Sequence, residues 1–152
     1  MGIRLSRDEA WAELEAAHTG IYTTLRADGM PITLPVWFVA LDERIYVASP
    51  SHRKKVGRVR RDPRVSFLVE SGTRWAELRG VHLTGRAQFV EDPELYARVR
   101  TALSDKYDTF RSKREAMPDD TRAQYETEIV VMEIVPDERI LSFDNARVEL
   151  TE

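Results

Sequence analysis

The stretch GIYTTLRADGMPITLPVWFVALDERIYVAS, residues 20–49, decides the fold. It alternates apolar and polar residues in three segments, as half-buried β-strands do. Asp28-Gly29 separates the first two segments and is typical of a tight hairpin, because its residues tolerate a positive φ. Asp42-Glu43 separates the second segment from the third. The stretch therefore predicts the start of an antiparallel meander.

Further strands follow along the chain. RVSFLVE, residues 64–70, alternates regularly, and 128–143 predicts two more strands around a Pro-Asp turn. Residues 75–90 predict one long strand in which the apolar positions change parity near Arg79-Gly80. Because a slip of one residue reverses the faces of a strand, we expect a bulge or sharp bend there.

Helical periodicity appears in four places. Residues 6–18 predict an amphipathic helix behind a Ser6 cap, and residues 92–107 predict one with Asp92 as cap and Pro93 in its first turn. Residues 52–61 predict a short basic helix, and residues 111–127 a polar helical segment broken at Pro118. About seven strands with few helices predict a mainly β, α+β fold, a small antiparallel barrel with flanking helices.

Composition indicates one soluble domain spanning residues 1–152. With 152 residues, 42% of them hydrophobic and 32% charged, the chain can enclose a core of its own. The absence of cysteine excludes disulfides and thiolate chemistry. No apolar run approaches the length of a membrane span, so we expect a cytoplasmic protein without a membrane partner.

Pro35 is the first unusual residue, because it lies inside an apolar strand where a missing N–H interrupts the hydrogen-bond ladder. It marks either an edge strand or bulge, or a backbone segment, Pro35 to Phe38, left free to face a flat ligand. Val36 and Phe38 are explained by core packing. Trp37 points the other way and is barrel exterior, a subunit contact or a pocket wall.

The segment SHRKKVGRVRRDPR, residues 51–64, holds seven Lys or Arg residues and one acid, although the chain has a net charge of −3. On a helix, Val56 and Val59 form the inward stripe, and the cations that share the other side are Lys54, Lys55, Arg58 and Arg61. These cations are a solvated face, a nucleic-acid contact or a site for a small anion. Ser49 and Ser51 beside Arg53 and Lys55 could bind a phosphate at a helix N-terminus.

Other chemistries find little support. The acidic net charge opposes a nucleic-acid interface, which needs a wide basic stripe. His18, His52 and His82 lack a metal-ligand spacing, so we expect no metal site. No Gly-x-Ser-x-Gly motif is present, and we assign no catalytic side chain. A site without its own acid, base or nucleophile suits a cofactor that supplies the chemistry.

Four motifs in order resemble the split-β-barrel flavin and deazaflavin proteins related to pyridoxamine 5'-phosphate oxidase, and most of all the F420-dependent reductases of the B type. The motifs are Leu-x-x-Asp-Gly-x-Pro (25–31), Pro-Val-Trp-Phe (35–38), Arg-Lys-Lys-Val-x-x-x-Arg-Arg-Asp-Pro-Arg-Val (53–65) and Glu-Leu-Arg-Gly-Val-x-Leu-x-Gly-x-Ala (77–87). The resemblance extends over residues 15–145, nearly the whole chain.

The resemblance implies a homodimer with two cofactors at its interface. The cofactor ring would lie against Pro35 to Phe38, and its phosphate would meet the segment from Ser49 and Ser51 to Arg53 and Lys55, with Arg58 or Arg61 nearby. Trp75 and Arg79 would approach from the partner subunit. Members of the family commonly have Arg-Asn where this chain has Gly57-Arg58, which changes the expected phosphate contacts.

The activity implied by the resemblance is hydride transfer from reduced F420 to an electron-poor small molecule. The alternatives are an FMN-dependent oxidoreductase of the same fold and a cofactor-binding protein without turnover. F420 carries an acidic tail beyond its phosphate. Cations in excess of one phosphate site favour F420 over FMN, and those in excess here are Lys54, Arg58, Arg60 and Arg61.

Overall fold

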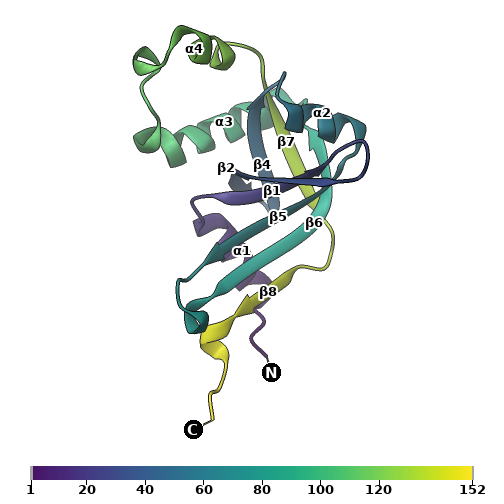
Figure 1. Ribbon diagram of the computed structural model, residues 1–152, viewed down its shortest axis with the longest axis vertical. Coiled ribbons are helices and arrows are strands. Elements are labelled where there is room, and N and C mark those ends of the chain that lie inside the picture. Colours follow the sequence, from purple (N-terminus) through teal and green to yellow (C-terminus); the bar gives the residue numbers. More distant parts are fainter. Residues whose placement is uncertain (1, 152) are drawn as a thin grey trace.

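A computed structural model describes residues 2–151, and these form one antiparallel sheet with flanking helices (Figure 1). The strands are β1 (Gly20–Leu25), β2 (Pro31–Val36), β3 (Val39–Leu41), β4 (Arg44–Pro50), β5 (Arg64–Ser71), β6 (Arg79–Phe89), β7 (Ile129–Pro136) and β8 (Leu141–Asp144). The α-helices are α1 (Arg7–Ala16), α2 (Lys54–Arg61), α3 (Pro93–Tyr107) and α4 (Asp119–Tyr125). The predicted mainly β, α+β class is confirmed.

The order of the strands forces the sheet to curl. Neighbours run β2-β1-β5-β6-β7-β4-β3, with β8 added beside β6. The two ends of this path, β2 and β3, are nevertheless consecutive in the chain and are joined by Trp37 and Phe38 alone. Three peptide steps span at most about 11 Å, so the sheet must bend until its two edges almost meet. The result is the predicted split barrel.

The second predicted strand is thus two strands. β2 pairs with β1, placing Pro35 opposite Ile21, whereas β3 pairs with β4. β2 ends the sheet on one side, and edge strands are where a sheet tolerates the missing N–H of a proline. The edge-strand interpretation of Pro35 is confirmed.

Two side chains from the end of α3 satisfy the backbone at the break between β2 and β3. The Tyr107 hydroxyl accepts from the N–H of Phe38 at 2.9 Å and donates to the carbonyl of His18 at 2.7 Å. The Lys106 ammonium donates to the carbonyls of Ala17 and Phe38, at 2.7 and 2.9 Å. It also lies 4.0 Å from the centre of the Phe38 ring. Polar groups that the sheet leaves unpaired are therefore hydrogen-bonded from outside it.

The core has two parts. Inside the barrel, Phe38 packs edge-on against Phe67 with ring centres 4.8 Å apart, and Trp11 and Leu14 of α1 extend the same cluster. Outside the barrel, the apolar face of α3 covers β3, β4 and β7 through residues spaced by four, which are Val99, Leu103 and Tyr107. The predicted spacing of this helix and its Asp92 cap with Pro93 are confirmed.

The remaining elements follow the prediction with three corrections. Ser6 caps α1 as predicted, and Pro118 opens α4. The predicted strand over 75–90 is wrong at its start, because Trp75–Glu77 form a 3-10 turn and β6 begins at Arg79. The basic helix begins at Lys54, two residues later than predicted, with Arg53 at its cap position. In the hairpin between β1 and β2, Gly29 has a positive φ and Asp28 does not.

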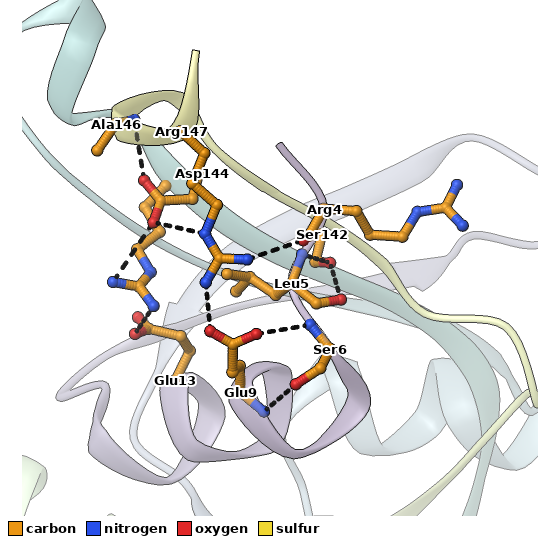
Figure 2. A network of polar contacts seen from close by, with 10 residues as sticks. Arg4, Leu5, Ser6, Glu9, Glu13, Ser142, Asp144, Ala146 and Arg147 are labelled. Carbon is orange, nitrogen blue, oxygen red and sulfur yellow. Dashed lines mark hydrogen bonds and ion pairs between the residues drawn. The ribbon is translucent and has the colours of Figure 1, made fainter. Parts of the chain in front are cut away.

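Polar contacts fasten the N-terminal segment to the C-terminal one (Figure 2). Arg147 donates to the Glu9 carboxylate and to the carbonyl of Arg4, and the amide of Leu5 donates to the Ser142 hydroxyl at 3.0 Å. The hydrogen bond from Arg147 lowers the pKa of Glu9 to about 2.

None of the helices among residues 2–151 is long and apolar enough to span a bilayer.

Removing the Tyr107 hydroxyl should destabilise the fold. Tyr107→Phe leaves the buried N–H of Phe38 and the carbonyl of His18 without this partner, and we expect a loss of about 1 to 3 kcal/mol in the free energy of unfolding, measured in urea. Tyr125→Phe is the control, because the structure gives the Tyr125 hydroxyl no hydrogen bond within residues 2–151. Equal stability of the two variants would contradict the bridging role.

Lys106 should make stability depend on pH. Burial lowers the pKa of Lys106 to about 8, against 10.5 for a free lysine. Between these values the unfolded chain keeps a proton that the folded chain has lost, so the free energy of unfolding rises with pH. Compared with Lys106→Met, the wild-type protein should gain on the order of 1 kcal/mol from pH near 8 to pH near 10. If the free energies of unfolding of the wild-type and Lys106→Met proteins changed with pH in parallel, Lys106 would make no such contribution.

Candidate functional site

A cleft of about 670 Å³ opens between β2, β4 and the start of α2. Its floor is apolar and aromatic, and one rim is cationic. The lining residues are Ile32, Leu34, Pro35, Val36, Trp37, Val47, Ala48, Pro50, Arg53, Lys54, Lys55, Arg58 and Tyr125. We call it the Lys55 cleft. Its size is typical of small-molecule sites.

The register of α2 follows from its two valines. Val56 and Val59 are fully buried against the barrel, as predicted, and this fixes the cations on the remaining faces of the helix. Arg58 is held by a 2.7 Å hydrogen bond from its Nε to the Thr24 hydroxyl of β1. Lys54, Lys55 and Arg58 thereby line the cleft beside the edge strand β2.

No ion pair within residues 2–151 neutralises these cations. Among residues 2–151, no carboxylate lies within 4 Å of the charged groups of Arg53, Lys54, Lys55 or Arg58. Burial, followed by repulsion from Arg53 and Arg58, lowers the pKa of Lys55. Partly buried like charges without a counter-ion cost folding free energy, so the arrangement fits a bound anion.

The structure brings most of the predicted site residues together. Seven line the Lys55 cleft, which are Pro35, Val36, Trp37, Arg53, Lys54, Lys55 and Arg58. Phe38 is fully buried behind them in the barrel core. Ser49 is buried, and its hydroxyl donates to the carbonyl of Pro50 at 3.2 Å. Ser51 lies in the turn before α2, where its amide donates to the carbonyl of Glu128.

Arg60 and Arg61 lie outside the Lys55 cleft. Arg60 stacks over the ring of Phe89, 4.4 Å from its centre. Arg61 lines a neighbouring groove of about 520 Å³ between α2 and the β1–β2 hairpin, and it donates to the carbonyl of Leu25. Lys54 and Arg58 line both the groove and the cleft, so cationic side chains continue from one into the other.

Trp75 and Arg79 lie at the other end of the molecule. They follow the turn of the β5–β6 hairpin, and β5 extends about 25 Å from the end of α2 to that turn. Trp75 is 58% exposed. Arg79 pairs with Glu13 at 2.9 Å and with Asp144 at 3.8 Å, in the network that joins the chain ends. Within one subunit these two residues do not reach the Lys55 cleft.

A comparison of the sequence with known protein families identifies the family of this chain. The family model described as pyridoxamine 5'-phosphate oxidase matches residues 6–151. This chain belongs to that family. Among curated proteins, none matches the chain.

Solved structures agree with the family assignment. A conserved hypothetical protein from Mycobacterium tuberculosis is 30% identical, with a TM-score of 0.79 over 99% of this chain and 93% of that one. An FAD-binding protein from Mesorhizobium loti is 22% identical, with a TM-score of 0.69 over 91% and 93% of the two chains. An F420 reductase is 23% identical, with a TM-score of 0.62 over 86% and 94%. The latter two show the shared fold.

Sequence reasoning missed six residues that line the Lys55 cleft, which are Ile32, Leu34, Val47, Ala48, Pro50 and Tyr125. Tyr125, at the end of α4, lines the Lys55 cleft although the polar segment 111–127 gave no sign of a site. Leu34 and Ile32 on the edge strand β2 also line it. Alternation on β2 could have identified Ile32 and Leu34, since they share one face of the strand with the predicted site residue Val36, but nothing local locates Tyr125. Within residues 2–151, no three His, Asp or Glu side chains form a metal-binding group.

Proposed function

We propose that this protein is an F420-dependent oxidoreductase that transfers a hydride to an electron-poor small molecule. One observation carries the proposal: four cations line the Lys55 cleft, and no carboxylate within residues 2–151 neutralises them. The family assignment supports a flavin-type cofactor, and an F420 reductase shares the fold.

The residues of the cleft divide the work of binding. Arg53, Lys55 and Arg58 would neutralise the phosphate, while Pro35 and Trp37 offer a flat surface to the ring. When bound, the deazaflavin supplies the hydride. The chain would hold ring and substrate at reacting distance and exclude water from the apolar floor. Among residues 2–151, no carboxylate or imidazole lines the cleft, and solvent would supply the proton.

The cations that continue beyond the cleft favour F420 over FMN. Lys54 and Arg58 connect the Lys55 cleft with the groove that contains Arg26 and Arg61. A phosphate occupies a single cluster of cations, whereas an acidic tail needs a row of them. One acid, Asp28, lines the groove, and Arg26 already pairs with it at 2.6 Å.

A cofactor-binding protein without turnover is the second candidate. The absence of a carboxylate or imidazole among the residues that line the Lys55 cleft favours it. Reduced cofactor mixed with a panel of enones, quinones and tetrapyrroles separates the two candidates. Oxidation above background by one of these compounds supports the enzyme, and its absence throughout the panel supports the binding protein.

Lys55→Ala should weaken F420 binding. Loss of one charge-assisted hydrogen bond corresponds to about 1 to 3 kcal/mol, or roughly 5- to 150-fold in the dissociation constant measured by fluorescence titration. Arg60→Ala is the matched control on the same helix, because Arg60 packs over Phe89 away from the cleft. Unchanged affinity of the Lys55 variant would place the phosphate elsewhere. Tight FMN binding without F420 binding would replace F420 by FMN in the proposal.

We also propose that the protein is a homodimer with the cofactor at its interface. The edge strand β2 supports this, because it exposes apolar side chains that a monomer leaves in water: Met30 just before it is 54% exposed and Leu34 is 45% exposed. A partner could also bring its own Trp75 and Arg79 toward the cleft, which one subunit cannot do.

Leu34→Glu should shift the protein toward the monomer. The change places a charge at an exposed position of β2, where it would be desolvated in a dimer but remain in water in a monomer. Light scattering with size-exclusion chromatography gives the mass, and Leu141→Glu, a change at another exposed leucine on β8, is the control. A wild-type protein that is monomeric at all concentrations would overturn the proposed dimer.

A further inference from the structure

A second cleft, of about 650 Å³, adjoins the Lys55 cleft on the side of α3. It lies between α3, the end of β4 and residues 108–125, which form the loop and α4 beside α3 in Figure 1. The two clefts share Trp37, Ala48, Pro50 and Tyr125. We call it the Arg100 cleft. A ligand in it would therefore lie beside whatever occupies the Lys55 cleft.

Arg100 is a positioned cation without a counter-ion. Its Nη1 donates to the Tyr96 hydroxyl at 3.1 Å, and that hydroxyl in turn donates to the carbonyl of Ile129 at 2.7 Å. The residue is half-buried, and no carboxylate within residues 2–151 lies within 4 Å of its guanidinium. Arg98, two residues earlier on α3, pairs instead with Asp42 at 2.9 Å.

Aromatic and cationic side chains lie beside Arg100 in the lining of the cleft. Trp37 stacks on Tyr107 with ring centres 4.5 Å apart and planes within 5°, which holds the indole rigid. Phe110 lines the cleft and is 60% exposed, an unusual position for a large apolar ring. Arg111 lies 5.5 Å from the Trp37 ring and pairs weakly with Asp108 at 3.5 Å. Asp108 is the one acid among the lining residues.

These features together favour one chemical class of ligand for the Arg100 cleft. Exposed aromatic rings bind flat, apolar molecules, and a half-buried guanidinium without a partner binds a carboxylate, often with two hydrogen bonds. A neutral ligand would leave the Arg100 charge desolvated and unpaired.

We propose that the Arg100 cleft binds planar conjugated carboxylates, with the carboxylate at Arg100 and the ring system against Trp37 and Phe110. That such a carboxylate is the substrate rests on the proposed function, because only a hydride donor in the Lys55 cleft would make it one. Binding itself requires no cofactor.

Calorimetric titration of 2-naphthoate into the full-length protein tests the proposal. The wild-type protein should bind 2-naphthoate, and it should bind 2-naphthamide, the same ring without the charge, about tenfold more weakly or worse. Arg100→Gln should weaken 2-naphthoate binding by a similar factor and leave 2-naphthamide binding unchanged. Arg98→Gln is the matched control on α3 and should bind both compounds as the wild-type protein does.

Three outcomes would overturn the proposal: no 2-naphthoate binding, equal affinity of the wild-type protein for both compounds, or equal 2-naphthoate affinity of wild-type and Arg100→Gln proteins. The comparison of the two compounds uses wild-type protein and so does not depend on the variant folding. Titration of the Arg100→Gln protein with F420 and FMN is the further check. A weakened cofactor affinity there would assign Arg100 to the cofactor and also overturn the proposal.

The same titrations separate this inference from the proposed function. A wild-type protein that binds 2-naphthoate through Arg100 but binds neither F420 nor FMN supports the inference and defeats the proposed function. Cofactor binding without discrimination between 2-naphthoate and 2-naphthamide supports the proposed function and defeats the inference.

Discussion

The hydrogen bonds that Tyr107 and Lys106 make to the backbone of Phe38 are the contact on which the architecture depends. The sheet's two edge strands are joined by two residues, so the barrel must remain open along this line and its backbone groups lack strand partners. The end of α3 supplies those partners. The same contacts dock α3 on the outside of the barrel, and the apolar face of that helix becomes the second core.

Trp37 links this structural break to the candidate site. As it belongs to neither β2 nor β3, its side chain is free to leave the sheet, and Tyr107 fixes it by stacking. Its ring then separates the Lys55 cleft from the Arg100 cleft. Trp37 thus lies both at the break in the strand and in the wall of two clefts, so the strand interruption coincides with the candidate site.

Electrostatics distinguishes the site from the rest of the surface. Several arginines elsewhere pair with carboxylates, as Arg64 does with Asp62 directly after α2. At the start of α2 and at Arg100 the cations are left without such partners, although the chain carries more acids than bases. Unpaired, partly buried charge lowers stability, and it is tolerated where a ligand supplies the missing anion. In the proposed function, the unpaired cations at the start of α2 bind an anionic cofactor.

Sequence alone determined the features that depend on neighbouring residues. Alternation gave the strands, spacing by four gave α3, and Val56 and Val59 gave the register of the basic helix, because each of these is a property of one element. The family motifs indicated the split barrel and Pro35 to Lys55 as the cofactor site. Only the tertiary structure decided that Trp37 and Phe38 interrupt a strand, that Tyr125 joins the cleft, and that Arg60 and Arg79 have partners elsewhere. Those outcomes depend on which distant segments meet, and such contacts leave no local pattern.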